Sequence, residues 1–131
     1  METLIATIAK GTEGYGVWIE NFPGVYGQGD TVEAAKTNLK EGLDLYIKYN
    51  KDIPAILKNE YEWEYCFDVP SFLEYYSKIF SKSALERLTG INQTQFTHYV
   101  SGFRKPSKKT TKKLDGAIHN LANELNQIHF V

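Results

Sequence analysis

The stretch SKSALERLTGINQTQFTHYVSGFRKP, residues 81–106, carries the most informative spacing in the sequence. Leu85 and Leu88 lie at helical spacing within residues 83–89, and Gly90 follows them. A glycine at this place ends a helix in a left-handed conformation that other residues adopt only at a cost. The stretch therefore predicts a short helix that stops at a tight turn.

A second helix is predicted to begin at Gln93. Asn92 and Gln95 form an Asn-x-x-Gln capping pair, which would satisfy backbone amides that a helix start leaves without partners. The expected inward stripe consists of Phe96, Tyr99 and Val100. The expected outward residues are all hydrogen-bonding side chains: Gln93, Thr94, Thr97, His98 and Ser101. Their lengths suit contacts to base edges or phosphates, so the two helices form a candidate helix-turn-helix.

Charge is distributed unevenly along the chain, although the net charge is only -1. Residues 1–81 hold seven lysines against thirteen acids, whereas residues 82–113 hold eight basic residues against the single acid Glu86. A basic segment of this kind indicates a polyanionic partner such as DNA. A solvated lysine-rich loop would give the same count, and two helices joined at a glycine also occur in all-α domains that never touch DNA.

The pattern of residues resembles the Cro/repressor-type (XRE) helix-turn-helix. The shared features, in order, are a leucine-rich helix with Leu85, the corner Gly90, a polar recognition helix, and a Gly-x-x-x-Pro ending at Gly102 and Pro106. The resemblance implies base reading by Gln93, Thr94 and His98, and phosphate contacts near Lys82, Arg104 and Lys105. With the outward Thr97, the expected DNA-binding residues are Lys82, Gln93, Thr94, Thr97, His98, Arg104 and Lys105.

Two positions depart from the repressor-type pattern. Glu86 stands where the family has a small residue in its first helix, and Val100 stands where an acidic residue is usual. A glutamate is costly to bury between two helices. We therefore expect the packing of these helices to differ from that of the family.

Composition limits the fold and the location. The chain has 131 residues, enough for one domain or two small ones, and 42% of them are hydrophobic. No apolar run reaches the roughly 18 residues of a membrane helix, and residues 1–10 lack the features of a signal peptide. We expect a cytoplasmic protein without a membrane association. Cys66 is the only cysteine, which excludes an intramolecular disulfide; we expect it to be a buried apolar filler.

The front half has the alternation of a sheet with one covering helix. Strands are predicted at residues 3–10, 15–20, 25–29 and 60–68, where aliphatic and aromatic residues alternate with polar ones. Asp30 or Thr31 is expected to cap the helix. Its apolar face comprises Val32, Ala35, Leu39, Leu43, Tyr46 and Ile47. Residues 50–59 are expected to form a loop around Pro54, so the predicted order is β-β-β-α-β.

Two glycines interrupt these elements. Gly27 in the third strand predicts either a sheet edge or a close approach by another backbone. Gly42 lies inside the helix at a cost of about 1 kcal/mol relative to alanine, which predicts close packing against a strand.

The rear half is predicted to be all helical. Ser71 and Glu74 match a capping box, so a helix is expected over residues 71–79 with Phe72, Leu73, Tyr76 and Ile79 inward. One or two closing helices are expected over residues 107–126. Their inward residues would be Leu114, Ile118, Leu121 and Leu125. The fold class is therefore α+β, with one domain over residues 1–68 and a second over residues 69–131.

The front half resembles the HicB antitoxin family. The similar residues are Gly14-Tyr15-Gly16-Val17-Trp18, Phe22-Pro23-Gly24-Val25, Gly27-Gln28-Gly29-Asp30-Thr31, and Ala34 with Ala35. In that family a partial ribonuclease H-like domain precedes a DNA-binding module, of helix-turn-helix or ribbon-helix-helix type. The resemblance implies the antitoxin of a type II toxin-antitoxin system. The front domain would neutralise a small basic HicA-type mRNA interferase, and the rear domain would repress the operon by binding operator DNA.

An acidic sheet has the charge needed to attract a basic RNA-binding toxin. Exposed aromatic residues among acids are candidate contact residues, so we expect toxin binding by Trp18, Glu20, Tyr26 and Gln28. The alternative interpretation is that Trp18 and Tyr26 belong to the core or to a dimer interface.

The sequence favours an interaction protein without catalytic residues, metal or cofactor. Its acids do not converge as metal-dependent hydrolysis requires, and all three histidines, His98, His119 and His129, lie in the rear half. The alternative function is a stand-alone repressor whose front domain senses a ligand or dimerises. Either function predicts a homodimer or a higher even oligomer, because repressor-type helices read paired half-sites about 34 Å apart.

Overall fold

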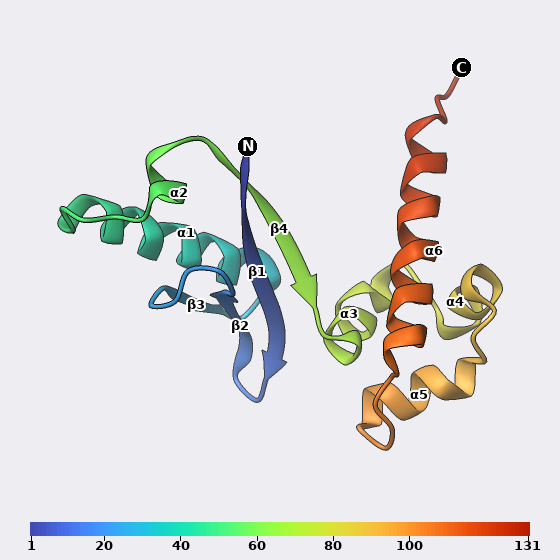
Figure 1. Cartoon of the computed structure of the whole chain (residues 1–131). Helices are drawn as coiled ribbons and strands as arrows, with labels where there is room; N and C mark the ends of the chain where they lie inside the picture. Colours follow the sequence, from blue (N-terminus) through green and yellow to red (C-terminus); the bar gives the residue numbers. More distant parts are fainter. The chain divides into compact units, whose positions relative to one another are not determined.

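The chain is an α+β protein that divides into two compact units, Met1–Ser71 and Phe72–Val131. The computed structural model describes all 131 residues and is shown in Figure 1. The expected border at residues 68 and 69 lies three residues earlier than the border between the units. The first turn of the next helix stays with the front unit because the Lys10 amide donates to the buried Ser71 Oγ at 2.9 Å.

The front unit is a four-stranded mixed sheet with one long helix. Its elements are β1 (Glu2–Gly11), β2 (Gly14–Ile19), β3 (Tyr26–Gly29), α1 (Val32–Tyr49), α2 (Ala55–Lys58) and β4 (Tyr61–Phe67). The strand order is β3-β2-β1-β4, in which only the β1–β4 pair is parallel. The predicted order of strands and helix is confirmed. The single turn α2, which follows the fixed backbone angle of Pro54, was expected to be loop.

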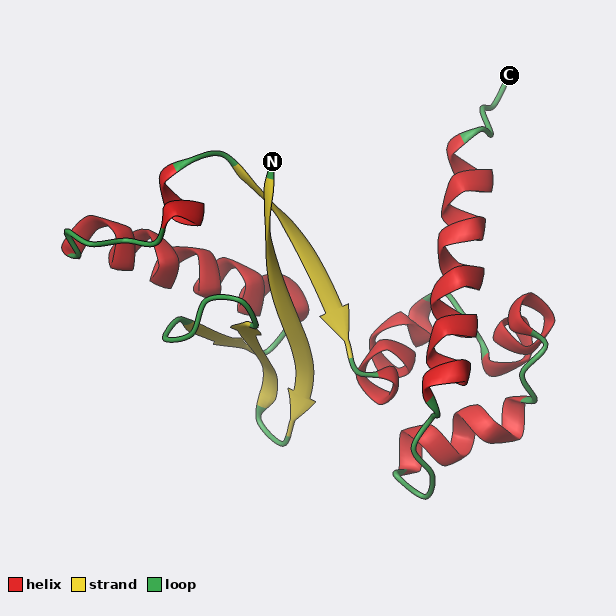
Figure 2. Ribbon diagram, in the orientation of Figure 1, coloured by secondary structure: helices red, strands yellow, loops and turns green.

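The core of the front unit lies between the sheet and α1 (Figure 2). The alternation of β1 puts Leu4, Ala6 and Ile8 on the covered face, and all three are fully buried. The helix contributes Val32, Ala35, Leu39 and Leu43. Tyr46 and Ile47 are only half-buried, because they lie in the last turns of α1. Thr31 is the N-cap, since its Oγ1 accepts a hydrogen bond from the Ala34 amide at 3.0 Å.

Glycine at position 27 lets α1 lie directly on β3. A Cβ at Gly27 would come within 2.6 Å of both the Ala35 carbonyl oxygen and the Leu39 nitrogen. The strand is also a sheet edge, so both predictions for Gly27 hold. The prediction for Gly42 is wrong, because its nearest neighbour, Val25 Cγ1, would lie 3.5 Å from an added Cβ. The close approach therefore involves the strand glycines Gly27 and Gly29, which lie against Ala34 and Ala35 of α1.

The strand β4 has one covered and one open face, as its alternation predicts. Tyr61, Trp63 and Tyr65 are half-buried, and the Lys36 ammonium lies 3.9 Å above the Tyr65 ring. Desolvation by burial lowers the pKa of Lys36 from its ordinary value. On the opposite face Glu62 and Glu64 are exposed. Cys66 shares that face and is half-buried, so the expectation of a buried filler is wrong: only one face of this edge strand is covered.

The rear unit is helical, and its elements are α3 (Val69–Tyr75), a 3-10 turn η1 (Tyr76–Lys78), α4 (Lys82–Thr89), α5 (Gln93–Ser101) and α6 (Lys108–Asn126). The expected capping box at Ser71 and Glu74 is wrong. Asp68 caps α3 instead, because its Oδ1 accepts from the Ser71 amide at 2.8 Å. The Ser71 hydroxyl is used by Lys10, a residue 61 positions earlier that a local pattern cannot reveal. No helix of the chain has the length and apolar content needed to span a bilayer.

Leucine and aromatic side chains from all the helices form the core of the rear unit. The buried residues include Leu73, Leu85, Phe96, Tyr99 and Leu114. Three apolar residues predicted to be inward are exposed: Ile79, Val100 and Leu125. Ile79 follows the 3-10 turn, which changes the helical phase, and Val100 lies beyond the stripe that nine-residue α5 presents to the core. Leu125 lies in the last turn of α6, and the end of this helix extends past the other helices of the rear unit (Figure 1).

Candidate functional site

The first candidate site is the pair of helices α4 and α5. Ser81 Oγ caps α4 by accepting from the Ala84 amide at 3.0 Å, and Gly90 ends it with φ at 77°. The buried Thr89 hydroxyl donates to the Leu85 carbonyl at 2.6 Å and accepts from the Ile91 amide at 3.1 Å. These bonds leave little freedom in the turn, so the direction of α5 relative to α4 is fixed locally.

The start of α5 is held by two side chains, of which only one was expected. Asn92 Oδ1 accepts from the Thr94 amide at 2.8 Å, as its capping role predicts. The second partner is Glu86 in place of Gln95: its Oε1 accepts from the Gln93 amide at 3.2 Å. Glu86 therefore satisfies an amide at the positive end of α5, where a carboxylate is favourable. It is half-exposed, which explains how a glutamate is accommodated here.

Glu86 also fixes the orientation of the Gln93 side chain. Its Oε2 lies 3.3 Å from Gln93 Nε2, and a carboxylate can only accept hydrogen bonds. The amide nitrogen of Gln93 must therefore turn toward Glu86. The carbonyl Oε1 of Gln93 is left as an acceptor for a partner outside the chain. Sequence reasoning missed this contact because it joins residues seven positions apart across a turn.

The outward face of α5 is polar, as predicted. Gln93, Thr94, Thr97 and Ser101 are exposed. His98 differs from them, because it is half-buried and its Nδ1 is buried without a hydrogen-bond partner. Its ring meets Phe103 edge-on, with the centroids 4.9 Å apart. Only part of the His98 ring is therefore available for an external contact.

Exposed basic residues precede and follow α5 in the chain. Lys82 lies in the first turn of α4, and Arg104 and Lys105 follow α5 directly. Four further exposed lysines lie in the first turns of α6: Lys108, Lys109, Lys112 and Lys113. Phe103 is 70% exposed in the same loop and was not predicted as a site residue. Its position just after the left-handed Gly102 is the signal that could have identified it.

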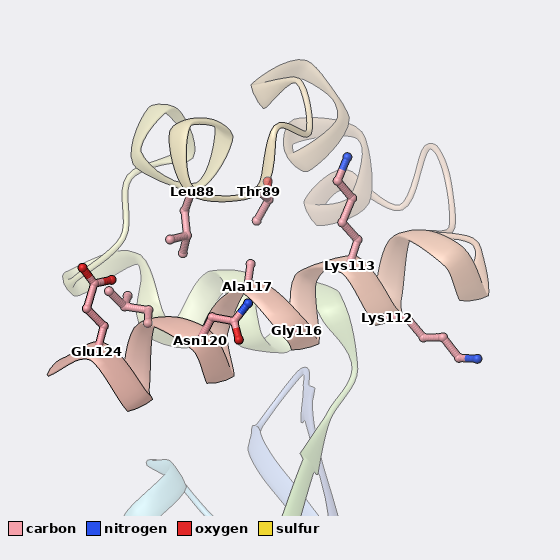
Figure 3. Close-up of a pocket in the computed structure, with 9 residues that line it drawn as sticks. Leu88, Thr89, Lys112, Lys113, Gly116, Ala117, Asn120 and Glu124 are labelled. Carbon is pink, nitrogen blue, oxygen red and sulfur yellow. The ribbon is translucent and has the colours of Figure 1, made fainter. Parts of the chain in front are cut away.

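A shallow groove of about 350 Å³ lies between the end of α4 and α6 (Figure 3). Leu88 and Thr89 line one side, and α6 lines the other with Lys112, Lys113 and Glu124 among its residues. The apolar residues lie toward the middle, and the charged groups lie toward the ends and do not converge on one point (Figure 3). No group of three or more histidine, cysteine or acidic side chains in the chain could hold a metal ion.

The second candidate site is the face of the sheet opposite α1. Register places Thr7, Trp18 and Tyr26 side by side across β1, β2 and β3. Glu20 Oε1 accepts from Thr7 Oγ1 at 2.7 Å and from Trp18 Nε1 at 2.8 Å. The Trp18 ring is thus held in place while it remains exposed. This rigid arrangement suits a contact residue, because little side-chain entropy remains to be lost on binding.

The remaining residues predicted for this face also lie on it. Gln28 pairs with Gly16, and the Tyr26 hydroxyl lies over the same glycine, 2.9 Å from where its Cβ would be. The four predicted residues therefore form one surface, which we call the open sheet face: Trp18, Glu20, Tyr26 and Gln28. Trp18 and Tyr26 are outside the core, so the core interpretation is wrong. Glu62 and Glu64 extend the acidic character of this face on β4.

No protein-family model matches this sequence, and no curated protein matches it either. The two candidate sites differ in charge, since acids lie on the open sheet face and the exposed residues that flank α5 in the chain are basic.

Proposed function

We propose that the chain is an antitoxin of the HicB type. Its front unit would neutralise a HicA-type mRNA interferase, and its rear unit would repress the operon through a repressor-type helix-turn-helix formed by α4 and α5. The observation that carries the proposal is the outward face of α5: Gln93, Thr94 and Thr97 are exposed on a capped helix, and exposed basic residues flank that helix in the chain. Such a helix suits the major groove of DNA.

The open sheet face supports a protein partner for the front unit. It combines exposed aromatic rings with the carboxylates of Glu20, Glu62 and Glu64. Aromatic residues supply much of the energy of protein interfaces, and acids raise the association rate with a basic partner. A small ribonuclease needs a basic surface to hold RNA, so the same surface would fit this face. The resemblance to the HicB family is the reason for naming a HicA-type toxin.

We propose no catalytic activity for the front unit. Hydrolysis of RNA by metal ions needs several carboxylates that converge on one point. The Glu20 carboxylate accepts hydrogen bonds from Thr7 and Trp18. Glu62 and Glu64 lie along the edge strand β4. Purified protein that cleaved RNA with magnesium, and lost this activity on Glu20→Gln, would contradict the proposal.

The proposal is tested by capture of the tagged full-length chain from its native host, with mass spectrometry of the proteins that co-purify. The expected result is a small basic protein from the adjacent gene in stoichiometric amount. That protein should arrest growth when expressed alone and not when expressed with this chain. Recovery of the chain with DNA and no protein partner would favour the stand-alone repressor. Trp18→Ala with Tyr26→Ala should then be compared with the parent, and an unchanged yield of the partner would exclude the open sheet face as its contact.

Removal of the Lys105 charge should weaken binding to every DNA sequence. The Lys105→Ala variant is expected to flatten the dependence of log K on log salt by about 0.9, because one phosphate contact releases its counterion. Fluorescence anisotropy at several salt concentrations measures this slope on operator and on random duplex. Lys48→Ala on α1 is the matched control, and it should leave the slope unchanged. A loss confined to operator would contradict a phosphate role for Lys105.

The Glu86→Gln variant should change sequence preference and general affinity in opposite directions. A glutamine can donate as well as accept, so Gln93 would no longer be held with its carbonyl outward. Discrimination at the base that faces Gln93 should fall about tenfold, within the 1–3 kcal/mol typical of a bidentate base contact. Affinity for random duplex should rise, because a negative charge near phosphates is lost.

Site selection from a random DNA pool measures the preference of the Glu86→Gln variant. Glu124→Gln on α6 is a control that removes the same charge elsewhere on the rear unit. If both variants selected the parent site with unchanged preference, Glu86 would have no part in orienting Gln93.

A further inference from the structure

The His98 side chain on α5 has two ring nitrogens in different surroundings. Its Nδ1 is buried and has no hydrogen-bond partner. The other nitrogen, Nε2, also makes no hydrogen bond within the chain, but it is not buried. His98 follows the exposed Thr94 by four residues, so both side chains lie on the outward face of α5, one turn apart. The accessible Nε2 is therefore the atom through which His98 can bond a partner of this face.

The burial of Nδ1 determines which nitrogen carries the hydrogen. A neutral imidazole has one N–H and one bare nitrogen, and the surroundings of the ring select between the two forms. A hydrogen on Nδ1 would be a buried donor without an acceptor, which is rare in folded proteins. The hydrogen therefore lies on Nε2. His98 thus presents one outward donor and no outward acceptor.

An apolar ring lies beside this donor. Phe103 is 70% exposed and meets the His98 ring edge-on, with the centroids 4.9 Å apart. The backbone fixes its place, because Gly102 ends α5 with φ at 80° and the Arg104 amide donates to the His98 carbonyl at 3.2 Å. The Arg104 guanidinium lies 5.7 Å from the centroid of the Phe103 ring. A single donor, an apolar surface and a cation suited to a phosphate therefore lie together.

We propose that His98 and Phe103 together recognise a thymine in the major groove: His98 Nε2 donates to O4, and the Phe103 ring contacts the C5-methyl group. Guanine presents the acceptors O6 and N7 together, so its recognition takes two donors, and His98 has one. Adenine has an amino donor beside N7 and no apolar group for the Phe103 ring to meet. Thymine alone presents an acceptor and a methyl group side by side. The inference rests on the proposed function, because it names a base that α5 would read.

The position of the hydrogen on His98 is tested without DNA. Nitrogen-15 NMR of the full-length chain distinguishes the two neutral forms of histidine, because protonated and bare ring nitrogens resonate far apart. Mildly alkaline buffer keeps imidazole side chains neutral. The expected result is a protonated Nε2 and a bare Nδ1, with the signals assigned by their loss in His98→Leu. A hydrogen on Nδ1 would overturn the inference.

Base analogues in a duplex test the thymine itself. The probe is a site that the parent chain selects from a random DNA pool, and selection with His98→Leu identifies the position at which preference is lost. The expected base there is thymine. Uracil at this position removes only the methyl group and should weaken binding by the parent about fourfold, the effect of one apolar carbon left in water. The analogue 5-methylcytosine, paired with guanine, keeps the methyl group but has an amino donor in place of O4. It should weaken binding about tenfold or more.

Two variants separate the two contacts. Phe103→Ala should bind the thymine and uracil duplexes equally and still reject 5-methylcytosine, whereas His98→Leu should lose this rejection. Phe130→Ala is the matched control, because it removes another exposed phenylalanine of the rear unit and should keep the fourfold loss with uracil. Circular dichroism verifies the helix content of each variant. If His98→Leu lost helix, His98→Ala would replace it with the same expected result.

Three results with DNA would overturn this inference. The first is equal binding of the thymine and uracil duplexes by the parent, and the second is a base other than thymine at the position that His98→Leu ceases to prefer. The third is selection of the parent site by His98→Leu with unchanged preference. Each would leave the proposed function standing, because the parent would still bind its selected site. A parent chain that preferred no duplex over another would contradict the proposed DNA-binding function, and this inference with it.

Discussion

Replacement of Phe96 by alanine is expected to unfold the rear unit and to abolish DNA binding. Phe96 is fully buried and contacts Tyr99 edge-on, with the ring centroids 6.3 Å apart. Truncation of a buried phenylalanine costs about 3–5 kcal/mol. The whole stability of a domain of this size is typically about 5 kcal/mol. The Phe96→Ala substitution should therefore remove most of the free energy of unfolding of the rear unit.

Hydrogen exchange resolved by peptide can separate the two units in the Phe96→Ala variant. Amides of residues 72–131 should lose protection, while those of the sheet keep theirs, and capture of the proposed toxin partner should persist. Phe103→Ala is the matched control, because this ring is 70% exposed and its removal should alter stability by at most about 0.5 kcal/mol. Full protection of the rear unit in Phe96→Ala would show that its core does not depend on this ring.

The Gly27→Ala substitution should have the largest effect in the front unit. The added Cβ would lie 2.6 Å from two backbone atoms of α1, and backbone cannot swing aside as a side chain can. Either α1 or β3 must shift, at an expected cost of about 3 kcal/mol. Capture of the proposed partner protein should fall with the folded fraction, while the DNA binding proposed for the rear unit should persist.

A second glycine gives a control of opposite sign for Gly27→Ala. At Gly42 a Cβ would meet only ordinary contacts, at 3.5 Å or more. Gly42→Ala should therefore stabilise the front unit by about 1 kcal/mol through helix propensity alone. Urea unfolding followed by tryptophan fluorescence measures both variants. Equal and small effects of the two substitutions would mean that α1 does not press on β3 as described.

Local signals in the sequence predicted most of the helix boundaries. Thr31 and Asn92, which were expected as caps, each accept from a backbone amide in the first turn of the helix that follows. Ser81 and Ser107 cap α4 and α6 in the same way, although no cap was predicted there. Such caps are short-range, so the sequence contains all that is needed to find them. Strand alternation likewise predicted that strands lie over residues 3–10 and 15–20, where β1 and β2 are found.

The predictions that failed depended on distant residues. Ser71 matches a capping box, but its hydroxyl is used by Lys10 on another strand. Glu86 breaks the repressor-type pattern, and only the structure shows that it holds Gln93. Leu125 has the period of an inward residue, yet periodicity cannot tell whether any helix lies opposite it. In each case the local sequence pattern was present, but the distant residue that decides the contact, or its absence, could not be inferred from that pattern.

The border between the two units falls inside α3 and not in a linker. Residues 69–71 belong to the front unit, where Val69 is buried and Ser71 is bonded to β1, while the rest of the helix belongs to the rear unit. A front fragment cut at residue 68 would lose these contacts and leave a strand end unprotected. Exchange of rear units between related chains would succeed only if the recombination point lay beyond Ser71. Recombination that exchanges the two units during evolution is therefore restricted to junctions in α3 that follow Ser71 closely.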